Sequence, residues 1–593
     1  MLKLKGIPIN QGISEGTVFI KINPIKTLLK KKCATIDPTI EIDNYLKIIT
    51  TLQHEFQQLK YNNIALSNNT NQQMADLYIA ILNDPVFKKR IPEHIEKQKI
   101  PATYIILQNI ETIKQEFAKI DNEYFRSRFD DFQSIGYTLL ERLTGSRGYR
   151  SINKPKIIVA ENISAADLLH LPLEYIQGII TADGGATSHA AILAEALDIP
   201  AIFGVKTIIE HINRRDKIIM DGYGGDVIIN PLPETCIFYH NLIQRHIQYE
   251  ENIIASAKDC HTTKDGYPIS ILANIGNLYD IHLIHKYNAD GVGLLRTETM
   301  VLLQEQLFSE EEQTLYYESF FKETKHLPIS IRTLDLGGDK IIKNSSITPL
   351  DEENPFLGFR STRQFVRDPQ EFKKQIRALL KSYHLNPNIK IIIPFVTTLD
   401  DLLTLKDIII ECYKELYTSP FTIPIGIMAE VPSALICLPD YFPHIDFISI
   451  GTNDLTQYIL ATDRNNNYVS HYHNSAHPAI IRLLYYAGQQ CLEHNIPLSI
   501  CGEMAKEPYF IRLLYGLGIS TLSMSPIGIP MARYILANST REECQQIVKD
   551  IIPMQHTQQI EDYLYQDLVK FLTKQNAYFD NCIINTTSTV TRS

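Results

Sequence analysis

The longest pattern of apolar and polar positions near the start of this chain has a helical period. Apolar side chains recur three and four residues apart, and one such face comprises Leu46, Ile49, Leu52, Phe56 and Leu59. The segments ATYIILQNIETIKQEFAKI and FDDFQSIGYTLLERLTG repeat the pattern. The spacing predicts an all-helical domain over residues 33–145.

Short runs of β type lie on both sides of this helical block. The runs KIIVA, GIIT, AIFG and KIIMDGYGGDVIIN follow it, separated by turns and at least one helix, and the segment MLKLKGIPINQGISEGTVFI precedes it. We expect residues 1–32 and 146–230 to form one discontinuous α/β domain into which the helical domain is inserted.

The second half of the chain alternates strands and helices. Residues 231–261 lack strand signals and predict a connecting helix. Over residues 262–583, eight β-like runs are separated by helix-length spans: ISILANI, DGVGLLRTE, ISIRTLDLGG, IKIIIPFV, IPIGIMAEV, DFISIGTND, IPLSICGE and STLSMSP. This alternation predicts a (β/α)8 TIM barrel. The polar end of the chain, residues 584–593, is expected to be disordered.

Composition excludes several classes of protein. The formal net charge is -10 at pH 7 without a basic run, which argues against nucleic-acid binding. No apolar stretch approaches the roughly 20 residues that span a bilayer, and the N-terminus does not resemble a secretory signal. The 9 cysteines are scattered without a C-x-x-C spacing, so we expect neither a disulfide framework nor a zinc knuckle. A cytoplasmic location is the simplest expectation.

Charged residues end most of the predicted barrel strands. In barrels of this kind the working groups lie at the carboxyl ends of the strands. Convergent arginines indicate an anionic ligand, here a small phosphorylated acid, because guanidinium groups match phosphate and carboxylate geometry. The alternative is that these charges pair with one another around the rim. The residues are Arg296, Glu298, Arg332, Asp335, Lys340, Arg360, Glu430, Asn453, Asp454, Arg464, Cys501 and Glu503.

Two further kinds of chemistry are possible at these strand ends. Glu430 and Asp454 supply hard oxygen ligands from neighbouring strands, which suit one Mg²⁺ or Mn²⁺. Cys501, whose ordinary pKa would be about 8.5, could donate a proton to a carbanion-like carbon, or could be a small buried residue. A second candidate for a metal site is HYHNSAH, with His471, His473 and His477. Surface histidines in a long loop are the simpler interpretation of that segment.

One histidine lies where a glycine turn becomes a helix, in GGATSHAAILAEALDIPAIFG. Gly184 and Gly185 allow a tight turn, and Thr187 or Ser188 can cap the helix that contains His189 in its first turn. Free N–H groups and the helix dipole would stabilise a phosphoryl group on this imidazole. The alternative is a structural histidine bonded to a neighbouring carbonyl.

Seven segments together resemble a known family. They are the histidine segment above, DGVGLLRTE, IRTLDLGGDK, ENPFLGFRSTRQF, IGIMAEVPSA, FISIGTNDLTQYILATDR and SICGEMA. In this order they are similar to enzyme I of the bacterial sugar phosphotransferase system, the phosphoenolpyruvate-protein phosphotransferases, from about residue 4 to 540.

The resemblance implies a function for each domain. Phosphoenolpyruvate would bind the barrel, and its phosphoryl group would pass to His189 and then to a histidine of the phosphocarrier protein HPr. The helical domain would dock that carrier, and the barrel would form a homodimer. Because the histidine lies in another domain, hinges are expected near residues 146–154 and 231–260.

The resemblance also implies roles for single residues. Mg²⁺ would be held by Glu430 and Asp454, and Cys501 would protonate the enolate carbon to give pyruvate. The residues that would hold the substrate are Arg296, Arg332, Asn453, Asp454 and Arg464, together with Arg360 and Lys340.

The chain departs from the family pattern at a few positions. Thr299 stands where the family usually has an aromatic residue, and Phe395 where methionine is common; we expect both to concern packing. In the helical domain, Gln133 and Ser134 replace residues that are often charged, which concerns affinity for the carrier.

Three rival interpretations remain at this point. A relative of phosphoenolpyruvate synthase or pyruvate phosphate dikinase would need an ATP-binding domain of several hundred residues. A nitrogen-branch paralogue of enzyme I would carry an additional N-terminal sensory domain. A silent regulatory scaffold would not need an intact set of catalytic and binding residues, which here are His189, Arg296, Arg332, Glu430, Asp454 and Cys501.

Overall fold

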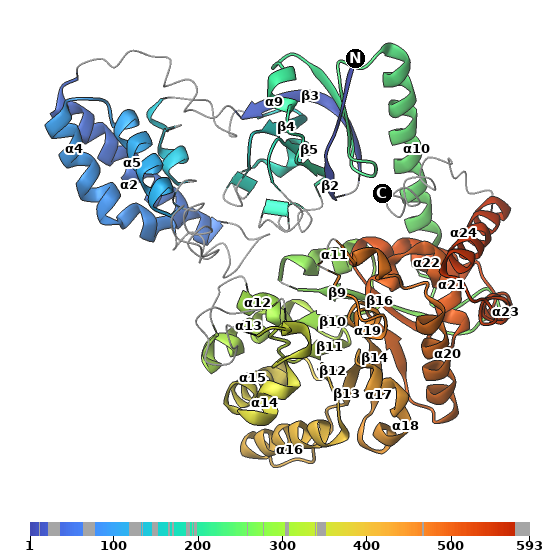
Figure 1. The fold of residues 1–593 in the computed structure, drawn as a ribbon. Coiled ribbons are helices and arrows are strands. Elements are labelled where there is room, and N and C mark those ends of the chain that lie inside the picture. Colours follow the sequence, from blue (N-terminus) through green and yellow to red (C-terminus); the bar gives the residue numbers. More distant parts are fainter. Residues whose placement is uncertain are drawn as a thin grey trace. The chain divides into compact units, whose positions relative to one another are not determined.

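A computed structural model gives the fold of the chain (Figure 1). The chain divides into two compact units between Ile247 and Gln248, and each unit is considered by itself. The structure describes residues 1–10, 12–21, 36–62, 78–117, 132, 135–140, 142–144, 152–163, 167–168, 171–184, 190–191, 194, 199–257, 259–276, 278–302, 307–338, 340, 352–464, 466 and 468–575.

The first unit contains an 8-stranded mixed sheet with the strand order β1-β8-β7-β3-β4-β5-β6-β2. Strands β3 to β6 run parallel to one another in that order, while β1, β2 and β7 join the sheet by antiparallel pairing. The expectation that the N-terminal strands complete this α/β domain is therefore confirmed. The strands are β1 (Leu2–Lys5), β2 (Ile7–Asn10), β3 (Ile13–Lys21), β4 (Lys156–Ala160), β5 (Ile176–Thr181), β6 (Ala201–Phe203), β7 (Lys217–Asp221) and β8 (Asp226–Ile229).

The helical domain is inserted between two strands that are neighbours in the sheet. β3 and β4 pair in parallel, with Val18 opposite Ile157, although more than 100 residues separate them in the sequence. The helices described within the insertion are α2 (Pro38–Asn62), α4 (Ile91–Gln98) and α5 (Ala102–Phe117), with the π-helical turn η1 (Val86–Arg90) before α4.

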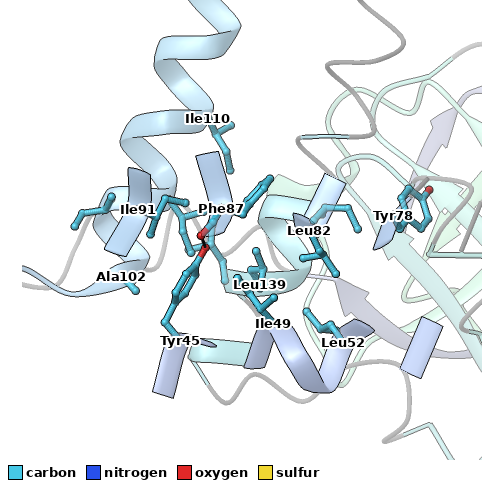
Figure 2. Packing of buried hydrophobic residues seen from close by; sticks show 14 of the residues in the cluster. Tyr45, Ile49, Leu52, Tyr78, Leu82, Phe87, Ile91, Ala102, Ile110 and Leu139 are labelled. Atoms are coloured by element: carbon cyan, nitrogen blue, oxygen red, sulfur yellow. Dashed lines mark hydrogen bonds between the residues drawn. The ribbon is translucent and has the colours of Figure 1, made fainter. Parts of the chain in front are cut away.

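Helix α2 buries the predicted face except at its first position, where Tyr45 is buried in place of Leu46. Leu46 is 38% exposed, while Tyr45 is fully buried and its hydroxyl donates a hydrogen bond to the Phe87 carbonyl at 2.9 Å (Figure 2). Ile49 and Leu52 are buried as expected. The face therefore starts at Tyr45, because a large aromatic ring that also satisfies a buried carbonyl displaces the leucine. The side chain of Leu59 lies outside the described residues.

Helix α10 (Pro233–Ala257) occupies the segment where a connecting helix was expected, and the two units divide within it. A 4-residue helix, α9 (Ile208–His211), precedes strand β7 in the first unit. None of the helices in the part of the chain that the structure describes is both long and apolar enough to cross a membrane.

The second unit is a closed barrel of parallel strands in the order β10-β11-β12-β13-β14-β15-β16-β9 (Figure 1). The predicted TIM barrel is confirmed, and each of the eight β-like runs contains one strand. The strands are β9 (Ser270–Ile275), β10 (Val292–Arg296), β11 (Ile329–Arg332), β12 (Ile389–Ile393), β13 (Ile425–Ala429), β14 (Phe447–Ile450), β15 (Leu498–Ile500) and β16 (Thr521–Met524).

Helices follow the strands around the barrel. The first six are α11 (Ile281–Lys286), α12 (Glu298–Leu302), α13 (Glu310–Glu323), α14 (Thr362–Arg367), α15 (Gln370–Ser382) and α16 (Leu399–Leu416). The remainder are α17 (Pro432–Ile436), α18 (Leu438–Tyr441), α19 (Thr452–Ile459), α20 (Pro478–Glu493), α21 (Pro508–Gly516), α22 (Ile529–Ala537), α23 (Arg541–Ile551) and α24 (Thr557–Lys574).

The barrel interior is packed with side chains from β10, β12, β13 and β14 and from the end of β15. A buried cluster of Leu294, Ile392, Met428, Phe447 and Cys501 fills it. A filled interior leaves the carboxyl ends of the strands as the face on which ligands bind.

Candidate active site

A buried carboxylate follows strand β11 and gathers cationic side chains around it. Asp335 has no exposed side-chain surface. It accepts hydrogen bonds from Arg360 Nε at 3.0 Å, Arg360 Nη2 at 2.9 Å and Lys340 Nζ at 2.6 Å. Arg332 Nη1 lies 3.7 Å from its Oδ2 atom. Burial alone would raise the pKa of Asp335, but these charges outweigh burial and hold the pKa well below its ordinary value. Asp335 is therefore an anion at every physiological pH.

A second buried carboxylate, Glu298, begins helix α12. It pairs with Arg332 Nη2, and its Oε1 atom lies 3.2 Å from Lys340 Nζ. Here too the pKa is lowered, because Arg332 and Lys340 outweigh the effect of burial. Arg332 and Lys340 are each held between Glu298 and Asp335.

Two arginine side chains at the barrel mouth keep hydrogen-bonding capacity. The Nε atom of Arg332 is buried and has no hydrogen-bond partner among the described residues. Arg296, which lies beside Arg332 in the strand register, is half-buried and makes no ion pair with a described carboxylate. A buried guanidinium donor without a partner carries a desolvation cost, which an anionic ligand would remove.

Arg360 lies fully buried between strands β11 and β14. Beyond Asp335, its Nη2 atom donates to Asp454 Oδ2 at 2.9 Å and its Nη1 atom donates to the Tyr458 hydroxyl at 3.2 Å. The Tyr458 hydroxyl in turn donates to the Phe356 carbonyl at 2.8 Å. Each of these partners accepts a hydrogen bond, so the guanidinium is fixed in one orientation.

Glu430 and Asp454 form an acidic pair at the ends of β13 and β14. Glu430 is 1% exposed, and burial together with the charges of Asp454 and Asp335 raises its pKa to about 8. Asp454 keeps a lowered pKa despite burial, because Arg360 and Arg464 offset the cost. Its Oδ1 atom is buried without a hydrogen bond from the described residues, with Arg464 Nη1 3.5 Å away.

The donor set and the charge of this pair suit a divalent cation. Two carboxylates that cannot both ionise without added positive charge are the usual protein ligands of Mg²⁺. Gly451 leaves room for this pair, because a Cβ atom there would lie 2.7 Å from Glu430 Oε2. The described part of the chain holds no group of three or more potential metal ligands, so water and substrate would complete the coordination.

Asn453 and Cys501 lie on adjacent strand ends. The Asn453 side-chain oxygen accepts from the Glu503 backbone N–H at 2.9 Å, so its amide NH₂ points elsewhere. Cys501 is 3% exposed, and its Sγ atom lies 3.5 Å from the Ile450 carbonyl. Burial raises the pKa of the Cys501 thiol. The group is therefore a protonated thiol at neutral pH, which is the form that a proton donor needs.

The histidines singled out in the sequence do not lie together in the described part of the structure. His189 lies outside the described residues, as do Gln133, Ser134 and the predicted disordered tail 584–593. His473 Nε2 lies 3.0 Å from the Asn453 carbonyl, His477 caps α20 by accepting from the Ala479 N–H, and His471 stacks on Tyr472. These three rings have separate partners, and the alternative of a histidine metal cluster receives no support from them.

The sequence showed Asp335 and Glu298 as candidate residues but not their roles, and it did not single out Tyr458. Asp335 and Glu298 were visible as charges at strand ends, but the pattern did not show that they hold Arg332, Lys340 and Arg360. Tyr458 carried no signal beyond its position in helix α19. Side-chain pairing of this kind depends on which strand ends face each other, which the sequence gives only after closure of the barrel is known.

Comparison with known proteins places the chain. Three protein-family profiles match it: "PEP-utilising enzyme, N-terminal" over residues 5–128, "PEP-utilising enzyme, mobile domain" over 152–225, and "PEP-utilising enzyme, PEP-binding domain" over 251–541. A Bacillus sp. (strain S) protein named "Phosphoenolpyruvate-protein phosphotransferase" is 31% identical, covering 95% of this chain and 97% of that protein. The chain belongs to the phosphoenolpyruvate-protein phosphotransferase family. Its substrate is phosphoenolpyruvate and its reaction is phosphoryl transfer.

Two further relatives agree with this placement. The phosphoenolpyruvate-protein phosphotransferase of Mycoplasma pneumoniae is 30% identical over 98% of this chain and 100% of its own length. An Escherichia coli protein named "Phosphoenolpyruvate-dependent phosphotransferase system" is 33% identical over 87% of this chain but 69% of its own length. The Bacillus and Mycoplasma relatives are both phosphoenolpyruvate-protein phosphotransferases, which favours that family over the nitrogen-branch and synthase or dikinase alternatives.

Removing the charge of Asp335 should destabilise the barrel strongly. In Asp335→Asn the buried cations lose their shared anion, and breaking a buried ion pair in this way costs about 3–5 kcal/mol of the free energy of unfolding. Glu415→Gln is the matched control, because its pair with Arg377 is half-exposed and should contribute less than about 1 kcal/mol. Thermal unfolding of both variants measures the difference; equal melting temperatures would contradict a structural role for Asp335.

Proposed function

We propose that this chain transfers the phosphoryl group of phosphoenolpyruvate to His189 and from there to a histidine of the phosphocarrier protein HPr. The observation that carries the proposal is the hydrogen-bonding capacity left on Arg296 and on the Arg332 Nε atom, beside an acidic pair whose charge suits a cation. His189 falls within the segment that matches the mobile-domain profile.

The proposed chemistry divides among side chains of the barrel. Arg296, Arg332 and Arg464 would bind the phosphoryl oxygens, and Asn453 would donate its free amide to them. Mg²⁺ held by Glu430 and Asp454 would neutralise charge on the substrate. Phosphoryl transfer of this kind depends on positioning and charge more than on covalent chemistry.

The reaction leaves a carbanion that must be protonated. A nitrogen of the His189 imidazole forms a bond to phosphorus as the bond from phosphorus to the enol oxygen breaks. The enolate of pyruvate then takes the proton of the Cys501 thiol at its methylene carbon, which gives pyruvate and a thiolate. The raised pKa of Cys501 supports this role because it keeps the proton on sulfur until the enolate forms.

The partners follow from the separate domains. We infer that the helical domain docks HPr, since it is inserted into the α/β domain that contains His189. We also infer that the protein acts in the cytoplasm, where the free thiols of its described cysteines would stay reduced.

Phosphorylation at His189 is directly testable. Incubation with phosphoenolpyruvate labelled in its phosphate should give acid-labile label on the protein and not on His189→Ala, because phosphohistidine is the proposed intermediate. His211→Ala, which changes an exposed histidine of the same unit, is the control and should keep the label. Label that survives His189→Ala, or none on the parent protein, would favour the scaffold interpretation.

Cation binding should release a proton. The pKa of Glu430 is raised to about 8, so this carboxyl is neutral at pH 7 in the metal-free protein and must ionise to bind Mg²⁺. Calorimetry in buffers of different ionisation enthalpy should show about one proton released per Mg²⁺ at pH 7 and far less at pH 9. Glu430→Gln should bind Mg²⁺ weakly. Release that does not change between these pH values would contradict the assignment.

We further propose that the barrel forms a homodimer through an apolar patch on α17 and α20. Ile436, Tyr485, Tyr486 and Leu492 expose between 36% and 63% of their surface there. Clustered exposed apolar side chains commonly mark protein interfaces. In sedimentation velocity, Leu492→Asp should shift the protein toward monomer, while Leu416→Asp on α16 should not. A dimer unchanged by Leu492→Asp would place the interface elsewhere.

A further inference from the structure

One aromatic residue at the barrel mouth has a backbone conformation that bulky side chains rarely adopt. Phe395 follows strand β12, is 2% exposed, and has a φ angle of 56°. Left-handed backbone at a bulky residue persists only where the surroundings impose it, and such residues gather at functional sites. Ser361, next to Arg360, also has a positive φ of 51°. Both unusual residues flank the same arginine.

The left-handed turn directs the backbone of Phe395 at the acidic pair. Its N–H donates to Glu430 Oε1 at 2.8 Å. A hydrogen bond to one oxygen of a buried carboxylate fixes the plane of that carboxylate and leaves the second oxygen for a ligand.

The ring of Phe395 supports the arginine on the other side. The guanidinium carbon of Arg360 lies 4.9 Å from the ring centroid and that of Arg363 lies 5.1 Å from it. Tyr458, which accepts a hydrogen bond from Arg360, contacts the same ring edge-on at 5.9 Å. Both cations are attracted by the quadrupole of the ring. The Phe395 ring thus packs against the Arg360 guanidinium, while Asp335 and Asp454 accept hydrogen bonds from the N–H groups at the edge of that guanidinium.

We propose that Phe395 is a positioning residue that aligns Arg360, the guanidinium that holds Asp335 and Asp454, through its ring and the metal ligand Glu430 through its backbone N–H. The inference rests on the proposed function, which assigns Glu430 and Asp454 to the metal at the substrate site. It replaces our expectation that the aromatic residue at this position concerns packing alone. Packing could be met by an aliphatic side chain, whereas the cation contacts require an aromatic face.

The two halves of the proposal can be separated by substitution. Phe395→Leu removes the aromatic face but keeps the backbone N–H, and Phe395→Tyr keeps both. In a His189→Ala background, which cannot be phosphorylated, calorimetry measures binding of phosphoenolpyruvate and of Mg²⁺ without turnover. We expect Phe395→Leu to weaken phosphoenolpyruvate binding by about 3- to 30-fold, the range of a cation–π contact, and to leave Mg²⁺ affinity within about twofold. Phe395→Tyr should bind both like the parent.

A control separates positioning from packing. Phe571 lies on helix α24, away from the strand ends. The guanidinium carbon of Arg512, on helix α21, lies 5.0 Å from the centroid of its ring. Phe571→Leu should lower the melting temperature without changing phosphoenolpyruvate affinity. The inference is overturned if Phe395→Leu binds phosphoenolpyruvate like the parent, if Phe395→Tyr is weakened as much as Phe395→Leu, or if Mg²⁺ affinity falls in parallel. A parent that binds no phosphoenolpyruvate would instead overturn the proposed function.

Discussion

The buried carboxylate of Asp335 is the constraint on which the candidate active site depends. It has no exposed surface, and Arg360, Lys340 and Arg332 all approach it. A buried ion pair that loses one partner leaves an uncompensated charge, so the members of this network hold one another in place. The ends of β10, β11 and β14 are thereby fixed relative to one another. Because Arg332 is already held by Glu298 and Asp335, its Nε atom, which has no partner among the described residues, has a defined direction.

The carboxylates of the site fall into two electrostatic classes. Asp335 and Glu298 have lowered pKa values because cations surround them, while burial beside Asp454 raises the pKa of Glu430 to about 8. The first class is satisfied by the protein itself and serves structure. Glu430, in the second class, needs additional positive charge beside it before it can ionise together with Asp454. Opposite shifts in neighbouring acids commonly separate such roles, and here they separate the structural carboxylates from the pair that we propose binds a cation.

The fold could be predicted from the sequence more fully than the site. The barrel followed from eight apolar runs that each end in polar residues, because that pattern reflects strands buried on both faces. The buried face of α2 was predicted correctly at Ile49 and Leu52 but not at its first position, since helical spacing alone does not choose between Leu46 and Tyr45. The backbone of Phe395 could not be predicted, because its partners Glu430 and Arg360 lie after strand β13 and in the loop before helix α14, far from it in the sequence. The spacing of apolar residues predicts helices and strands, whereas the contacts between strand ends form only once the barrel has closed.

The proposed reaction requires His189 to reach the barrel, and the structure limits where the chain can bend. Helix α10 is continuous over 25 residues, roughly 38 Å, and a helix without a proline or glycine in its interior resists sharp bending. After it, the buried Arg533 donates to the Cys260 carbonyl at 3.0 Å and pairs with Asp290 at 2.9 Å, which ties residue 260 to the barrel. A hinge within the predicted range of 231–260 would therefore lie at the ends of α10 and not within it. Asn230, with a φ of 48°, begins one of those ends.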